Sequence, residues 1–198
     1  MTARVVPFPD TRVAGALGLA GVAAGALGPA CAAACYPGFS LWYDSLSMLG
    51  TAAGGLWFNG GLLACGVLEM FLAAGILAHL SEGKPLRRAG AVLLMLSMAF
   101  LSAVGIVTED YGLAHFYTAA GFFTLFAAAS LALGLSFFRD PPFRTVGALA
   151  LFAAVMGVIA WFLPGEGWAI PELAAALPGM LWVGALAWTL ASKQAGNR

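Results

Sequence analysis

The stretch from Leu56 to Leu80, LWFNGGLLACGVLEMFLAAGILAHL, decides the fold class of this chain. It exceeds the roughly 20 apolar residues that a helix needs to cross the hydrocarbon core of a bilayer. Glu69 is its one charged side chain. Lipid offers the backbone no hydrogen-bond partners, so a spanning segment has to satisfy its own N–H and C=O groups, as an α-helix does. We therefore predict a transmembrane helix here.

Five other apolar stretches meet the same length criterion. The predicted spans are residues 13–34, 56–80, 89–107, 113–138, 146–163 and 172–192. Only 9% of the chain is charged and 62% is hydrophobic, whereas soluble domains carry about 25% charged residues. We predict an all-α polytopic membrane protein, in which residues 1–198 form a single membrane domain built as a six-transmembrane-helix bundle.

The basic residues set the predicted orientation. All nine fall before the first span, after the last, or in the loops after spans two and four: Arg4, Arg12, Lys84, Arg87, Arg88, Arg139, Arg144, Lys193 and Arg198. The alternate loops and span ends carry acids: Asp44, Glu109, Asp110, Glu166 and Glu172. Because basic loops stay in the cytoplasm, we predict a multi-pass protein of the cell (plasma) membrane with cytoplasmic N- and C-termini. The net charge of zero gives no indication of nucleic-acid binding.

The first span is rich in glycine, and Gly21 and Gly25 form a G-x-x-x-G pair. Small residues let membrane helices approach closely and gain packing contacts. We favour the interpretation that these glycines pack inside the bundle. The alternative is that they form the seam of a homo-oligomer.

The segment between the first two spans has an amphipathic pattern. Phe39, Trp42, Leu46 and Leu49 recur at helical spacing, with polar residues lying mostly elsewhere. Such a pattern, with aromatic side chains at headgroup depth, is typical of a helix that lies flat in the membrane interface. We predict a short outer interfacial helix over residues 39–49.

Glu69 is the first candidate for a binding residue. It lies about 20 Å along its predicted helix from the outer end, at 1.5 Å per residue. A charged carboxylate costs roughly 2.5–3.5 kcal/mol at such a depth, so Glu69 has to be protonated, paired or exposed to a wet cavity. A functional acid and a neutral acid hydrogen-bonded to a neighbouring helix are the two interpretations. With Asn59, His115, Trp57 and Trp42 it makes up the predicted ligand-binding set, around a cleft that opens outward.

His115 is the main candidate for chemistry, because histidine side chains commonly serve as bases and metal ligands in proteins. The acids Glu109, Asp110 and Asp44 and the hydroxyl of Ser45 lie on the same predicted side of the membrane, so these five residues are the catalytic candidates. The alternative is a histidine that orients an outer loop. The chain has two histidines, fewer than the roughly three protein ligands of a catalytic zinc. We predict neither a metal site nor a cofactor.

Four short motifs carry a family resemblance. They are Ser45–Gly50 (SLSMLG), Trp57–Gly61 (WFNGG), Val104–Glu109 (VGIVTE) and Leu113–His115 (LAH). Their order and spacing resemble the "domain of unknown function 998" family of small prokaryotic membrane proteins, over about residues 45–138. More loosely, the chain resembles the six-span Frag/DRAM-type membrane proteins, which are linked to lipid handling and membrane regulation.

The resemblance implies that certain outer positions matter without saying what they do. The signature residues correspond to Ser45, Gly50, Asn59, Glu109 and His115, and Glu69 is not among them. Three functions remain open: binding of a lipid or other amphiphile in an outward-facing intramembrane cleft, proton-coupled transport or channel activity through Glu69, and an enzyme acting on lipid headgroups through His115. We rank them in that order, with membrane lipids as the predicted partners.

Overall fold

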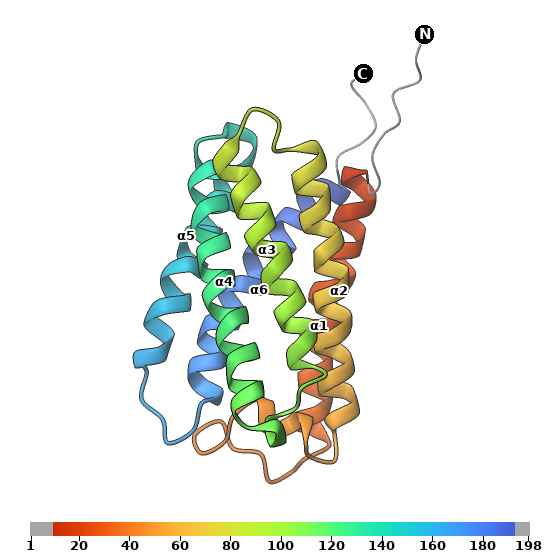
Figure 1. Ribbon diagram of the computed structural model, residues 1–198, viewed down its shortest axis with the longest axis vertical. Helices are drawn as coiled ribbons and strands as arrows, with labels where there is room; N and C mark the ends of the chain where they lie inside the picture. The colour runs from red at the N-terminus through yellow and green to blue at the C-terminus, as the bar shows by residue number, and fades with distance from the viewer. Residues whose placement is uncertain (1–9, 193–198) are drawn as a thin grey trace.

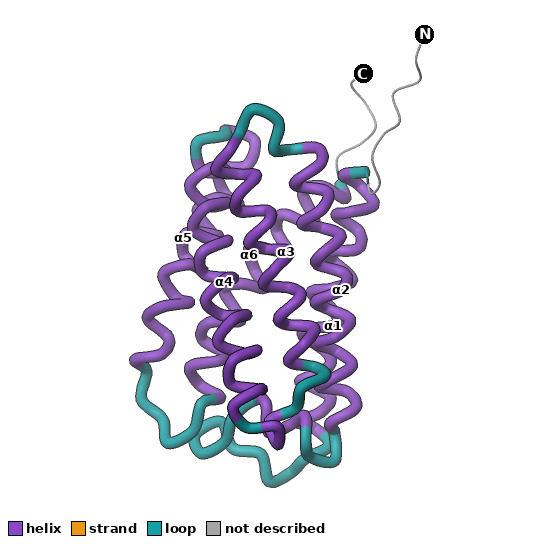
Figure 2. The backbone as a smooth tube through the Cα atoms, in the orientation of Figure 1, coloured by secondary structure: helices purple, strands orange, loops and turns teal. Residues whose placement is uncertain are grey.

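The computed structural model describes residues 10–192, and in this range it is built from helices and loops without strands (Figures 1 and 2). Six helices are long and apolar enough to cross a membrane: α1 (Thr11–Ala34), α2 (Gly55–His79), α3 (Pro85–Val104), α4 (Leu113–Phe138), α5 (Arg144–Ile159, with flanking short helices) and α6 (Ala169–Ala191). Short 3-10 helices are η1 (Ser47–Gly50), η2 (Glu109–Tyr111), η3 (Pro141–Phe143) and η4 (Ala160–Phe162). The predicted all-α bundle with six spans is confirmed.

The six helices form a closed ring. Each packs against its neighbours in the chain, and α1 also packs against α6. Successive helices run in opposite directions (Figure 1). The start of α1, the α2–α3 and α4–α5 loops and the end of α6 therefore lie at one end, which we call the basic end. The acids Asp44, Glu109, Asp110, Glu166 and Glu172 lie at the other, which we call the acidic end.

Several helix ends differ from the predicted spans, by up to four residues. Helix α3 begins at Pro85 rather than Ala89, because proline suits the first turn of a helix, where its missing N–H costs nothing. The predicted outer interfacial helix is shorter than expected: residues 39–46 form turns and bends, and only η1, Ser47–Gly50, is helical. Of the predicted inner bases, Arg4, Lys193 and Arg198 lie outside the described residues.

Arg87 joins three elements at the basic end. Its side chain is buried, and its Nη2 donates to Asp140 Oδ2 at 3.0 Å while its Nε donates to Ser136 Oγ at 3.1 Å. The guanidinium lies 4.3 Å from the centre of the Phe137 ring. Lys84 Nζ donates to the same Asp140 oxygen at 2.8 Å, and this hydrogen bond, with that from Arg87, holds the pKa of Asp140 below its usual value. The buried Arg87 therefore has a structural role, although the sequence suggests an ordinary basic residue in a loop.

The glycines of α1 face the inside of the ring. A β-carbon on Gly28 would lie 2.6 Å from the Trp57 carbonyl oxygen and 2.8 Å from Gly61 Cα of α2. One on Gly15 would lie 2.6 Å from the Ala187 carbonyl oxygen of α6. These approaches close the ring on both sides of α1, because they bring its backbone against α2 and α6. The favoured interpretation of internal packing agrees with this arrangement.

The half of the bundle nearer the basic end is filled by a packed apolar core. Leu72, Ile76, Leu94, Leu133 and Leu186 are fully buried there. The buried Trp182 belongs to the same cluster, and its indole Nε1 donates to Ser130 Oγ at 3.1 Å. Side chains therefore fill the inside of the ring in the half nearer the basic end.

Replacing Gly28 by alanine should destabilise the bundle. Its β-carbon meets backbone atoms of α2, which cannot rotate away, and overpacking of this kind costs about 1–3 kcal/mol. We expect Gly28→Ala to lower the Tm by at least ~2 °C. Gly60→Ala is the matched control, because a β-carbon there meets nothing within 4 Å. Equal melting temperatures for the two variants would show that close approach at Gly28 is not required.

The charge distribution predicts that the basic end faces the cytoplasm. Glu82 and Glu166 are exposed acids at opposite ends of the bundle, and each can be replaced by cysteine after Cys31, Cys35 and Cys65 have been changed to serine. In intact cells, a membrane-impermeant maleimide should label Glu166→Cys. It should label Glu82→Cys only after permeabilisation. The reverse pattern would refute the orientation.

Candidate functional site

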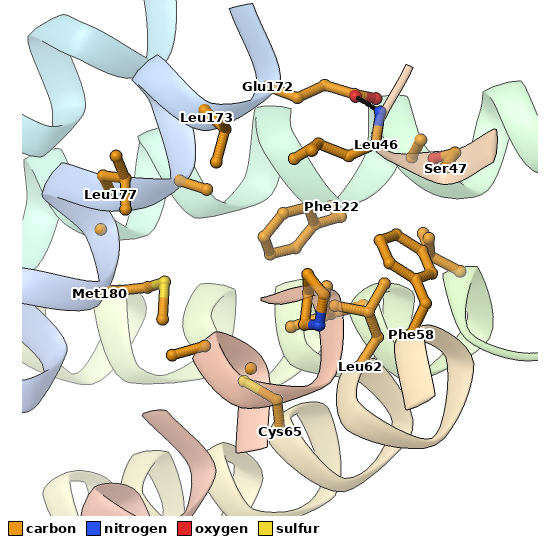
Figure 3. A pocket seen from close by; sticks show the side chains of 18 of the residues that line it. Leu46, Ser47, Phe58, Leu62, Cys65, Phe122, Glu172, Leu173, Leu177 and Met180 are labelled. Atoms are coloured by element: carbon orange, nitrogen blue, oxygen red, sulfur yellow. Dashed lines mark hydrogen bonds between the residues drawn. The ribbon is translucent and has the colours of Figure 1, made fainter. Parts of the chain in front are cut away.

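A cavity of about 370 Å³ lies between the packed core and the acidic end. Its walls come from α1, α2, α3, α4 and α6. The side chains labelled in Figure 3 belong to α2, α4, α6 and the α1–α2 segment. The floor consists of the lining residues farthest from the acidic end on each helix: Val22, Glu69, Met98, Phe126 and Val183. Most of the lining is aliphatic or aromatic. The cavity is therefore an apolar chamber with Glu69 on its floor.

Residues 35–54, which we call the strap, cross the acidic end between α1 and α2 and form the roof of the cavity (Figure 1). Phe39, Leu46 and Leu49 of the strap line the cavity. The far side of the strap is fastened to the α5–α6 loop, since the Trp42 carbonyl oxygen accepts from Gly167 N at 2.8 Å and the Asp44 carbonyl oxygen accepts from Ala169 N at 2.9 Å. The roof is thus tied down by backbone hydrogen bonds.

Two acidic side chains fasten the middle of the strap. Leu46 N donates to Glu172 Oε2 at 2.7 Å (Figure 3), and Glu172 lies in the first turn of α6, where the helix dipole favours a carboxylate. Ser45 Oγ donates to Glu109 Oε1 at 2.8 Å and accepts from Met48 N at 3.0 Å. The strap is thereby joined to α6 and to η2.

Glu69 has no comparable partner. Its side chain is 2% exposed, and within the described residues neither carboxyl oxygen has a hydrogen-bond partner. The carboxyl group rests against α1 at Gly21, where a β-carbon would lie 2.8 Å from Glu69 Oε1. This burial fits a neutral acid, and the hydrogen bond to a neighbouring helix that belongs to that interpretation is not among those of the described residues.

The exposed residues of the cavity lining lie on one side. They are Ala26 and Ala30 of α1, Leu41 of the strap and Leu177 of α6. The lining residues of α2, α3 and α4 are buried or partly buried. The parts of the cavity wall that also reach the molecular surface therefore belong to α1, α6 and the strap.

The predicted ligand-binding residues do not form one group. Of the five, Glu69 lines the cavity, whereas Trp42 and Trp57 lie on the surface at 44% and 58% exposure. Asn59 Nδ2 donates to the Gly50 carbonyl oxygen at 2.9 Å, so it fastens η1 to the start of α2. His115 is buried, and its Nδ1 lies 2.6 Å from the Val107 carbonyl oxygen.

The predicted catalytic residues are joined only in part. Ser45 bonds Glu109, but His115 bonds backbone before η2, and Asp44 Oδ2 accepts from Ser40 N at 2.8 Å. Asp110 bonds the neighbouring Thr108 hydroxyl. In the described structure, these groups hold the loops of the acidic end, and no hydrogen bond joins His115 to a carboxylate.

Sequence reasoning missed Glu172 as a cavity residue. The sequence places it at the outer end of the last predicted span, but it lies in the first turn of α6 and shares the cavity lining with Glu69. Its position after Pro171 in the first helical turn was the available signal, since acids there are typical of helix N-termini. The aromatic lining residues Phe122 and Phe126 of α4 carry no signal of their own, because phenylalanine is common in any span.

Removal of the Ser45 hydroxyl should loosen the strap. A hydrogen bond to a charged group contributes about 1.5–3 kcal/mol, so Ser45→Ala should speed amide hydrogen exchange in residues 40–50 by about tenfold or more. Thr51→Ala is the matched control, because the exposed Thr51 hydroxyl only bonds the Met48 carbonyl within its own turn. Unchanged exchange in Ser45→Ala would show that the bond to Glu109 does not hold the strap.

The comparisons with known proteins point to one family. No curated protein and no solved structure matches the chain. Residues 19–189 match DUF998, a family described as a protein of unknown function. The match covers most of the chain and includes the four motifs singled out in the sequence. This chain belongs to the DUF998 family.

Proposed function

We propose that this protein binds a lipid or other amphiphile in the cavity between the packed core and the strap, within the cell (plasma) membrane. The observation that carries the proposal is an apolar chamber of about 370 Å³ with a buried carboxyl group on its floor that has no hydrogen-bond partner among the described residues. Small-molecule sites usually measure ~300–1,000 Å³ and combine apolar walls with a few polar groups that orient the ligand.

The position of the cavity supports an occupant that comes from the membrane. Its exposed lining residues lie on α1, α6 and the strap, and in a membrane the outer faces of α1 and α6 would contact lipid. An apolar molecule entering there exchanges lipid contacts for protein contacts and does not have to cross water. The strap, fastened through Glu172 and Glu109, separates the chamber from the aqueous side of the acidic end.

Proton-coupled transport, the first alternative, requires a path from Glu69 to both ends of the bundle. Toward the basic end, Leu72, Ile76, Leu94 and Leu186 are 0% exposed and fill the ring. Catalysis, the second alternative, requires His115 and a carboxylate to meet within about 3 Å. Neither alternative gains support from these contacts, and binding remains the function that the geometry favours.

A binding assay with dodecanol in lipid nanodiscs tests the proposal. After subtraction of partitioning into empty nanodiscs, the full chain should bind about one dodecanol saturably. Ala119→Phe places a ring in the cavity and should weaken binding by at least about tenfold. Ala128→Phe on the exposed side of the same helix should bind as the unmodified chain does. Saturable binding that Ala119→Phe leaves intact would place the amphiphile outside the cavity and contradict the proposal.

A further inference from the structure

We propose that the cavity selects amphiphiles whose head is a cationic amine, with the ammonium group bound at Glu69 and the apolar tail extending toward the strap. This inference rests on the proposed function and adds the chemical class of the ligand. It follows from the juxtaposition of one unpartnered carboxyl group, a second carboxyl group and an otherwise apolar wall.

The first argument is the missing partner of Glu69. Buried carboxylates are ordinarily paired or hydrogen-bonded, because a charged group that leaves water uncompensated is strongly disfavoured. Glu69 is only 2% exposed, and neither of its carboxyl oxygens has a hydrogen-bond partner in the described residues. Gly21 leaves space for the carboxyl group because it has no side chain, and for the same reason it offers no side-chain donor. An ammonium group supplies both the charge and the N–H donors that this site lacks.

The second argument is the sign of the other polar groups in the wall. The lining residues with polar side chains are Ser47, Cys65, Glu69 and Glu172, and none of the described lining residues is a lysine, arginine or histidine. Pro29 is also in the wall and has no N–H. The Gly25 carbonyl oxygen therefore lacks its usual donor within the helix and can accept a hydrogen bond from another group. The ionisable groups of this wall can carry negative charge but not positive charge, so the wall favours a cation over a carboxylate or phosphate.

The third argument is the direction in which the cavity runs. On α2, the lining extends from Phe58 near the strap to Glu69 on the floor, 11 residues or about 16 Å at 1.5 Å per residue. The space between them is bordered by Leu62 and by Phe122 and Leu177 from other helices (Figure 3). A head at Glu69 therefore leaves the tail among apolar side chains, with Leu41 and Leu177 at the surface.

Competition among three ligands with the same dodecyl tail tests the head group. In nanodiscs of uncharged lipid, dodecylamine should bind the unmodified chain at least about tenfold more tightly than dodecanol, and dodecanoate should bind more weakly than either. Glu69→Gln should remove the preference for the amine while dodecanol still binds, which shows that the cavity is intact. Glu166→Gln, at an exposed acid of the same end, should keep the preference and controls for attraction to the surface.

The outcomes separate this inference from the function on which it rests. If no dodecyl compound binds in a manner sensitive to Ala119→Phe, the proposed function fails. If dodecanol binds in that manner but dodecylamine binds no better, or if the preference survives Glu69→Gln, the amine inference is overturned and amphiphile binding stands. Should Glu69→Gln not fold, the order of the three ligands on the unmodified chain still decides.

Discussion

Backbone contact between α1 and α2 at Gly28 and Gly61 is the constraint on which the rest of this bundle depends. The two glycines bring helix axes close together where a single methyl group would meet main-chain atoms. Membrane helices gain stability from such close packing, because lipid provides no hydrophobic drive between them. With α1 held against α2 and, through Gly15, against α6, the ring closes and encloses space at its acidic end.

The two halves of the ring differ in how far side chains fill the space inside them. Large aliphatic side chains such as Leu72 and Ile76, together with Trp182, fill the half near the basic end. In the other half the helices leave a chamber, and the strap covers it. Glu69 lies at the boundary between the two halves and is part of the cavity lining. Its burial without a hydrogen-bond partner among the described residues is the feature that packing alone does not explain.

The sequence predicted the helices well, because length, hydropathy and charge alternation act along the chain. Glu69 is recognisable from the sequence for the same reason, because a single acid in an apolar span stands out before the packing is known, and the structure buries it. The conformation of the strap was predicted poorly. The turns of residues 39–46 are held by hydrogen bonds to the α5–α6 loop and to Glu172, which are distant in sequence. The family motifs were recognised correctly, but the roles of Asn59 and Glu109 in fastening loops became visible only in three dimensions.

The most direct test of this account is a crystal structure of the full chain grown from a lipidic mesophase doped with dodecylamine. The account predicts an elongated density between the strap and the core, with its head within about 3 Å of a Glu69 carboxyl oxygen, the distance of a charge-assisted hydrogen bond. A chamber filled by side chains of the bundle, or ligand density confined to the outer surface with Glu69 still partnerless, would contradict it.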